Sequence, residues 1–166
     1  MADTAPKKLA TPTDLASNAV SSVADALNSA LADSFALYFK TKNFHWHVSG
    51  PHFRDYHLLM DDQAAQIYAI TDAIAERVRK TGGTTLRSIG DIARRQTIKD
   101  NDAEFVSADA MLAELRDDNL KLVEAFRTVK EQAEEAKDNA TSGIVDEWTD
   151  QAEERAWFLF EASRKA

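Results

Sequence analysis

The sequence lacks several features that define other classes of protein. It contains no cysteine, which excludes disulfide frameworks and thiolate metal sites. Only three prolines and five glycines occur in 166 residues, so few positions break helices. No apolar run approaches the length of a membrane span, and we expect no membrane partner. The N-terminus has no apolar segment of the secretory type, so a cytoplasmic location is expected.

Positive charge is also scarce. The chain has 20 Lys and Arg against 28 Asp and Glu, a net charge of −8, and a pI near 5.0. Such a surface repels nucleic acid and attracts cations. The short basic pairs are interpreted as ordinary solvated charge: Lys7-Lys8, Arg94-Arg95 and Arg164-Lys165.

What the sequence does have is helical periodicity. Residues 1–11 show none and are predicted to form a mobile tail, after which Thr13 has the character of an N-cap. Apolar residues then recur at steps of three and four until Ser49-Gly50-Pro51 interrupts them. A second helix is predicted over about 52–80, ending before Gly82-Gly83.

The second half predicts two more long helices. The connection over about 81–107 is too long for a structureless loop, and its apolar spacing indicates a short helix. A third helix is predicted over about 107–137, and a fourth is expected to be capped at Thr141. Two helices, a long crossover and two further helices are typical of an all-α, ferritin-like four-helix bundle. Residues 12–166 are therefore predicted to form one domain.

All four histidines lie in one short segment: His45, His47, His52 and His57. Carboxylates follow on the predicted second helix: Asp61, Asp62, Asp72 and Glu76. Imidazole and carboxylate together suit iron, manganese and zinc. This uneven distribution predicts a metal site.

The second helix carries two pairs of candidate ligands. His57 and Asp61 are four residues apart, as are Asp72 and Glu76, so each pair shares a helix face. The pair midpoints are about 22 Å apart along the helix, too far for both pairs to close on one metal. An antiparallel copy crossing near residues 66–67 would join unlike pairs from two subunits in two equivalent sites.

The other histidines are placed differently. His45, near the end of the first helix, could approach His57 from the side. His52 lies about 140° around the helix from His57, and His47 fits less well, so both are expected at the helix entry or the surface. No Glu-x-x-His motif occurs, and the last two helices have no histidine, which excludes the usual iron site inside one bundle.

At these positions the chain resembles the Dps family, the DNA-protection proteins of starved cells, or mini-ferritins. The resemblance rests on K-x-x-H-W-x-V-x-G-x-x-F-x-x-x-H-x-x-x-D from Lys42 to Asp61. It continues with D-x-x-x-E-R from Asp72 to Arg77 and with Gly82-Gly83. The helix lengths and Trp157-Phe158 also suit the family.

The resemblance implies a ferroxidase in a hollow dodecamer built from two-fold dimers. Carried over by position, the iron ligands come from two subunits: His45, His57 and Asp61 from one, Asp72 and Glu76 from the other. Hydrogen peroxide, in preference to dioxygen, would oxidise Fe(II), and ferric oxide would be stored in the cavity. Zinc is an expected competitor for this ligand set. Trp46 is assigned either to core packing or to quenching radicals beside the metal.

Departures from the family leave alternatives open. His47 stands where the family commonly has Asn, so an altered ligand set is possible. The tail offers only Lys7 and Lys8, offset by Asp3, where DNA-binding members often carry many lysines. One alternative is a nucleoid-associated, DNA-binding structural protein with a vestigial metal site; another is an inert helical bundle. Five acidic residues are candidates for lining iron-entry pores: Glu134, Glu135, Asp138, Glu147 and Asp150.

Overall fold

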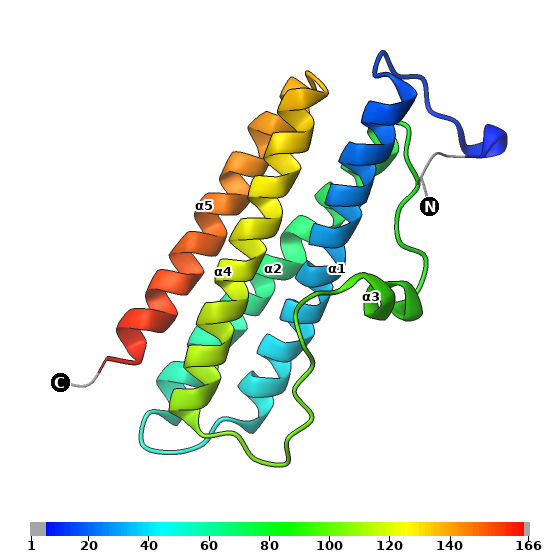
Figure 1. The fold of residues 1–166 in the computed structure, drawn as a ribbon. Helices are drawn as coiled ribbons and strands as arrows, with labels where there is room; N and C mark the ends of the chain where they lie inside the picture. Colours follow the sequence, from blue (N-terminus) through cyan, green and yellow to red (C-terminus); the bar gives the residue numbers. More distant parts are fainter. Residues whose placement is uncertain (1–5, 165–166) are drawn as a thin grey trace.

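Long α-helices account for most of the computed structural model, which describes residues 6–164 (Figure 1). A short 3-10 helix, η1, precedes them at Lys7–Leu9. The helices are α1 (Ser17–His47), α2 (Phe53–Lys80), α3 (Ile89–Arg95), α4 (Ala108–Glu135) and α5 (Asn139–Ala162). The described part of the chain contains no strand, so the all-α prediction is confirmed. None of its helices combines the length and apolar character that crossing a membrane requires.

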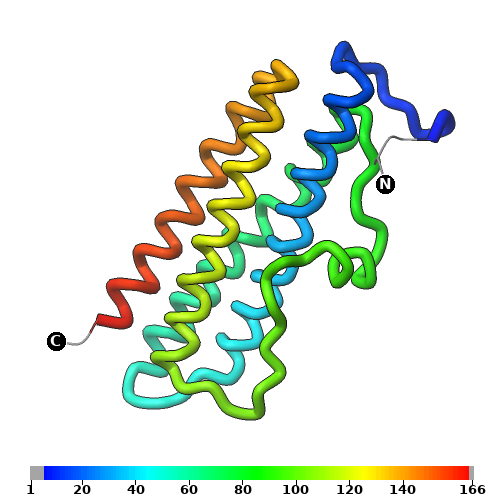
Figure 2. Tube along the Cα trace, viewed as in Figure 1, coloured from blue at the N-terminus to red at the C-terminus, as the bar shows by residue number. Residues whose placement is uncertain are grey.

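The four long helices form two antiparallel hairpins. One hairpin is α1 with α2, the other is α4 with α5, and α1 also packs against α4 (Figure 1). The connection between the hairpins runs along the length of the bundle, and α3 lies in it against α1 (Figure 2). This is the predicted ferritin-like bundle with one crossover and a short extra helix.

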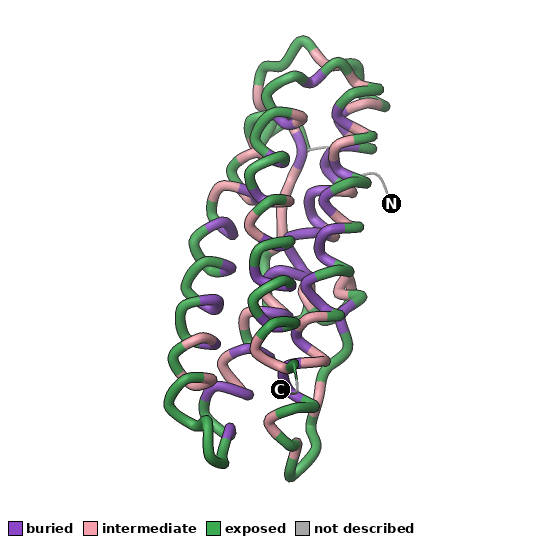
Figure 3. The backbone as a smooth tube through the Cα atoms, turned by 90° about the vertical axis from the view of Figure 1, so that its left-hand side faces the viewer, coloured by how far each residue is buried: buried purple, intermediate pink, exposed green. Residues whose placement is uncertain are grey.

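The core lies along the inward faces of the helices, where the buried residues gather (Figure 3). Leu27 and Leu31 of α1, Ile67 of α2 and Leu122 of α4 have at most 1% of their surface exposed. Burying a side chain of this kind contributes roughly 1.5–3 kcal/mol. The three-and-four spacing seen in the sequence is therefore the contact pattern that holds the bundle together.

The crossover is fastened to α1 by two buried polar side chains. The Asp33 carboxylate accepts hydrogen bonds from the Thr97 and Ile98 backbone amides, at 2.6 and 3.0 Å. The Asn28 amide donates to the Thr84 carbonyl oxygen at 2.9 Å. These bonds tie three loop groups, among them the amide of the buried Ile98, to α1, which explains how so long a connection stays against the bundle.

The C-terminal end of α2 was predicted correctly from its two glycines. Gly82 has φ 99°, a left-handed conformation that glycine adopts without strain. The Gly83 amide donates to the Val78 carbonyl oxygen at 3.0 Å, as expected for a helix ending of this type. A Cβ at Gly83 would lie 2.7 Å from the Ala24 Cβ, so glycine also allows close packing against α1.

Two predicted N-caps are wrong. The helix expected to start at Thr13 begins at Ser17, and the Thr13 hydroxyl instead accepts a local hydrogen bond from the Leu15 amide. The cap of α5 is Asp138, whose carboxylate accepts from the Thr141 amide, so Thr141 lies inside the first turn. At α5 two neighbouring residues have capping side chains, and sequence alone does not rank them. At α1 the N-cap is Ala16, which makes no side-chain hydrogen bond, so no capping residue marks the start of the helix.

The predicted N-terminal tail is only partly described. Residues 1–5 lie outside the described residues. In the described part, Arg79 donates a hydrogen bond to the Leu9 carbonyl oxygen at 2.7 Å, which places this segment beside the end of α2. The mobility of the tail stays a prediction.

Candidate metal centre

Two histidines from different helices meet at the α1–α2 turn. Nδ1 of His45 is 2.7 Å from the His57 carbonyl oxygen, and Nδ1 of His57 is 2.8 Å from the His45 carbonyl oxygen. The two rings stack with centroids 3.7 Å apart and an interplanar angle of 20°. His45 is buried and His57 is half-buried. The expected approach of His45 to His57 is therefore present in the single chain.

These reciprocal bonds decide which ring nitrogens can bind a metal. A carbonyl oxygen only accepts hydrogen bonds, so Nδ1 of each ring must carry its proton. In the neutral imidazole, Nε2 then has the free lone pair. Holding one nitrogen to a carbonyl is the usual way in which proteins orient a metal-binding histidine. His45 and His57 are thus prepared as Nε2 ligands before any metal arrives.

Asp61 lies beside this pair. Its Oδ1 is 3.8 Å from Nε2 of His45 and 2.7 Å from Nζ of Lys42, while its side chain is 51% exposed. The hydrogen bond from Lys42 lowers the pKa of Asp61, and the positive charge of Lys42 acts in the same direction. The carboxylate is therefore ionised at neutral pH, where a metal ion would compete with Lys42 for it.

Lys42 was quoted in the family pattern but not predicted as part of the site. Its ammonium group is the cation that faces Asp61 in the single chain, and it also lies 5.9 Å from the centroid of the Trp46 ring. The signal was the Lys42-x-x-His45 spacing, which places both side chains on one side of α1. The contact with Asp61 depends on how α1 packs on α2, which spacing alone does not reveal.

The second candidate pair lies far along α2. Asp72 and Glu76 are both exposed, and the Glu76 carboxylate pairs with Lys80 at 3.0 Å. Within residues 6–164 no group of three or more His, Asp or Glu side chains that could hold a metal forms. The single chain therefore presents two separate parts of a ligand set.

The face of α2 between the pairs is exposed and has little bulk apart from one tyrosine. Ala65 and Ala69 lie one turn apart there, both exposed. Tyr68 is 57% exposed and packs against Tyr38 of α1 with ring centroids 5.2 Å apart. Nothing within the described chain covers this face.

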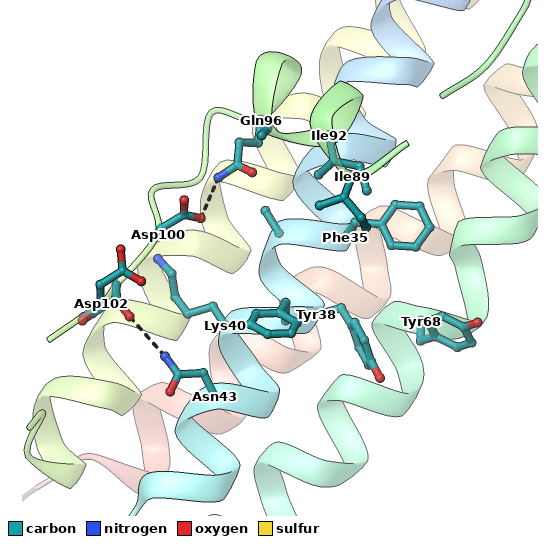
Figure 4. Close-up of a pocket in the computed structure, with 14 residues that line it drawn as sticks. Phe35, Tyr38, Lys40, Asn43, Tyr68, Ile89, Ile92, Gln96, Asp100 and Asp102 are labelled. Carbon is teal, nitrogen blue, oxygen red and sulfur yellow. Dashed lines mark hydrogen bonds between the residues drawn. The ribbon is translucent and has the colours of Figure 1, made fainter. Parts of the chain in front are cut away.

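A pocket of about 660 Å³ opens beside the same face (Figure 4). Tyr68 lies at one side of it, while Ile89 and Ile92 of α3 lie near Phe35 at another (Figure 4). Phe39 and Ile89, two of its lining residues, are 62% and 80% exposed. Large apolar side chains this exposed around one hollow are typical of a contact or binding surface.

The remaining predicted residues fall outside the stacked pair. His47 is exposed and contacts its own helix through the Asn43 carbonyl oxygen at 2.7 Å. His52 is the exposed residue before α2, and its ring lies tilted against that of Tyr56. Trp46 is 55% exposed, so the interpretation of Trp46 as a core residue is wrong for the single chain. Asp138 is buried against Arg77 and is not free to line a pore.

The comparisons with known proteins agree with this architecture. The ferritin-like domain model matches residues 24–165. A low temperature-induced protein of Nostoc is 36% identical over 138 residues, covering 82% of this chain and 77% of that protein. The DNA protection during starvation protein of Agrobacterium fabrum is 32% identical over 149 residues, covering 90% of this chain and 92% of that protein. The crystal structure of a Dps protein from Bacillus brevis superposes with a TM-score of 0.85 at 28% identity, covering 93% of this chain and all of that one.

Proposed function

The chain belongs to the Dps family of ferritin-like proteins, and from this premise we propose that it is a ferroxidase and iron store. Fe(II) and hydrogen peroxide are its substrates in this proposal, and ferric oxide is the stored product. The observation that carries it is the placing of two complementary ligand groups at opposite ends of one exposed helix face. Imidazole and carboxylate oxygens together suit Fe(II).

The site is completed by a second subunit in this proposal. His45, His57 and Asp61 of one subunit face Asp72 and Glu76 of the next across antiparallel α2 helices. Three features support this: no complete site forms in the described chain, the face between the groups is exposed, and its alanines allow two helices to approach closely. A two-fold axis near residues 66–67 then generates two identical sites.

In the proposed reaction the protein positions the iron ions and balances their charge. Each hydrogen peroxide takes one electron from each of two Fe(II) ions, and its O–O bond breaks to give two water molecules once protons are added. The Nε2 atoms of His45 and His57 bind Fe(II), and the carboxylates offset the charge gained on oxidation. Lys42 leaves Asp61 when the metal arrives. Zinc competes for the same ligands in this proposal.

The assembly is proposed to be a dodecamer of two-fold dimers. Apolar side chains around the pocket beside α2 support the dimer contact, as argued above. A second exposed aromatic group lies far along α5, formed by Trp157, Phe158 and Phe160. Two separate apolar surfaces let each subunit touch more than one neighbour, which a closed shell requires.

DNA protection is proposed to come from chemistry rather than from coating the DNA. Removing Fe(II) and peroxide together prevents the formation of hydroxyl radicals. The net charge of −8 and the presence of only two lysines in the tail disfavour direct binding. A cytoplasmic location, next to the nucleoid, is part of the same proposal.

Iron oxidation by hydrogen peroxide tests the proposal. The His57→Ala/Asp61→Ala double variant should lose more than about a hundredfold in initial rate, because loss of direct ligands exceeds the 10–100-fold effect of removing their supporting residues. The matched control is His47→Ala/Asp62→Ala, which removes the same residue types from exposed positions nearby. Equal rates in both double variants and the wild type would refute the ferroxidase assignment.

A further inference from the structure

Three helices each place one polar side chain in the core of the bundle, at a position where the neighbouring core residues are mostly apolar. Core positions of α5 follow steps of three and four: Val145, Trp148, Ala152, Arg155 and Leu159. Arg155 thus occupies a position that its neighbours fill with apolar groups, and only 1% of it is exposed. Asn119 of α4 is 1% exposed and Gln63 of α2 is 4% exposed, each between apolar core residues on its own helix.

Hydrogen bonds connect these side chains into one polar layer. Nε of Arg155 donates to Oδ1 of Asn119 at 2.8 Å, and the Asn119 amide group donates to the Leu115 carbonyl oxygen at 2.8 Å. The Gln63 amide group donates to the Arg155 carbonyl oxygen at 3.2 Å. Asn119 therefore holds the guanidinium through Nε, and Gln63 is bonded to the backbone of the same residue.

The layer leaves strong hydrogen-bonding groups unused. Nη1 and Nη2 of Arg155 and Oε1 of Gln63 are buried without a hydrogen-bond partner among residues 6–164. Burial lowers the pKa of Arg155 to about 10, so the guanidinium is still protonated at neutral pH. The carboxylate next to Asn119 in the chain, Asp118, is already paired with Lys40 at 2.6 Å and Lys121 at 3.2 Å.

We propose that the Arg155 guanidinium binds a small monovalent inorganic anion, of chloride or bromide size, in the core of the bundle. Nη1 and Nη2 supply the N–H donors, while Asn119 orients the guanidinium through Nε and Gln63 bonds the Arg155 carbonyl oxygen. Ferritin-like di-iron proteins place carboxylates and histidines in the bundle core to hold a cation. Here the core side chains are a guanidinium and two amides, and the guanidinium selects the opposite charge.

Charge favours an anion over a water molecule. Water could accept from the guanidinium, but it would leave the buried positive charge without a directly bonded counter-ion. An anion satisfies the N–H groups and the charge together. Because Nη1 and Nη2 are themselves buried, a small ion is favoured, and sulfate and organic anions should not enter.

Thermal unfolding of the full-length protein provides the first test. At constant ionic strength, replacing gluconate by chloride or bromide should raise the midpoint by about 3–5 °C for each tenfold rise above the dissociation constant. Arg155→Met should abolish this dependence, and the control Arg127→Met, at an exposed arginine paired with Glu153, should retain it. Identical midpoints in chloride and gluconate for the wild type would overturn the proposal.

Anomalous diffraction from crystals grown in bromide provides the second test of the anion site. A bromide peak within hydrogen-bonding distance of Nη1 or Nη2 supports the site. Ordered water alone at these atoms, or bromide only at surface positions as an adventitious ion, would overturn it. If Arg155→Met does not fold, the wild-type midpoints and the bromide map still decide the outcome. Neither experiment involves iron, so this inference can fail while the proposed ferroxidase stands.

Discussion

The two ends of α2 differ in how firmly the single chain holds their candidate ligands in position. At the end near the α1–α2 turn, His45 and His57 hold each other through reciprocal Nδ1–carbonyl bonds, and Asp61 is held by Lys42. At the other end, Asp72 is exposed, and Glu76 has only an exposed pairing with Lys80, which contributes little.

This difference shows which ligands must be oriented before the metal binds. Imidazole rings need a fixed orientation because each has one usable nitrogen, and the chain fixes it through backbone carbonyls. Exposed carboxylates rotate freely and can adjust to a metal that is already held. In the proposed shared site, the histidine end would capture the metal and the carboxylate end of a partner would complete the site.

Removing the carboxylate end should have the largest effect. Asp72→Ala/Glu76→Ala leaves the histidine pair intact, yet peroxide-driven iron oxidation should fall more than about a hundredfold because two of the five proposed ligands are lost. Zinc titration by calorimetry should still detect weak binding at the histidine end. Full oxidation activity in this variant would show that the histidine end acts alone.

Blocking the helix face between the two ends should have the next largest effect. Ala69→Arg places a long charged side chain on an exposed position, so the bundle itself should tolerate it. Residue 69 of both subunits lies near the proposed two-fold axis, so two arginines would repel each other there. Iron oxidation should fall roughly tenfold or more, and the fraction of dimer measured by light scattering should fall with it. Ala110→Arg on α4 is the control; an unchanged dimer in Ala69→Arg would place the contact elsewhere.

Removing Lys42 should have the smallest effect and the opposite sign. Lys42→Met removes the cation that competes with a metal for Asp61, so zinc affinity at neutral pH should rise by up to about fivefold, the range expected for an exposed ion pair. The pKa of Asp61 should rise toward its ordinary value, because the Lys42 hydrogen bond is the main cause of its lowering. Weaker zinc binding in Lys42→Met would instead make Lys42 a support for Asp61.

The fold could be predicted from sequence because its determinants are local. Spacing of apolar residues and the two glycines after α2 placed the long helices and the crossover to within a few residues. The cap at Thr141 was mispredicted because Asp138 offered a competing start. The cap at Thr13 was mispredicted because α1 begins after Ala16, which has no capping side chain. Arg155 was not predicted as a core residue because a charged side chain is expected to be exposed unless its packing neighbours are known.

The candidate site could be predicted only in part. The two pairs on α2 follow from residue spacing on one helix, which periodicity describes well. The stacking of His45 on His57, and the contact between Lys42 and Asp61, depend on how α1 packs against α2. Which ring nitrogen is free depends on backbone carbonyls in that packing, and no residue type in the sequence encodes it.

Mixing two inactive variants tests the shared site most directly. His57→Ala/Asp61→Ala and Asp72→Ala/Glu76→Ala subunits, unfolded and reassembled in equal amounts, form mixed dimers in about half of cases, and each mixed dimer has one intact site of two. The account predicts recovery of about a quarter of wild-type iron oxidation by peroxide from two preparations that are inactive alone. No recovery, in assemblies shown to contain both subunits, would mean that the two ends of α2 do not meet across an interface.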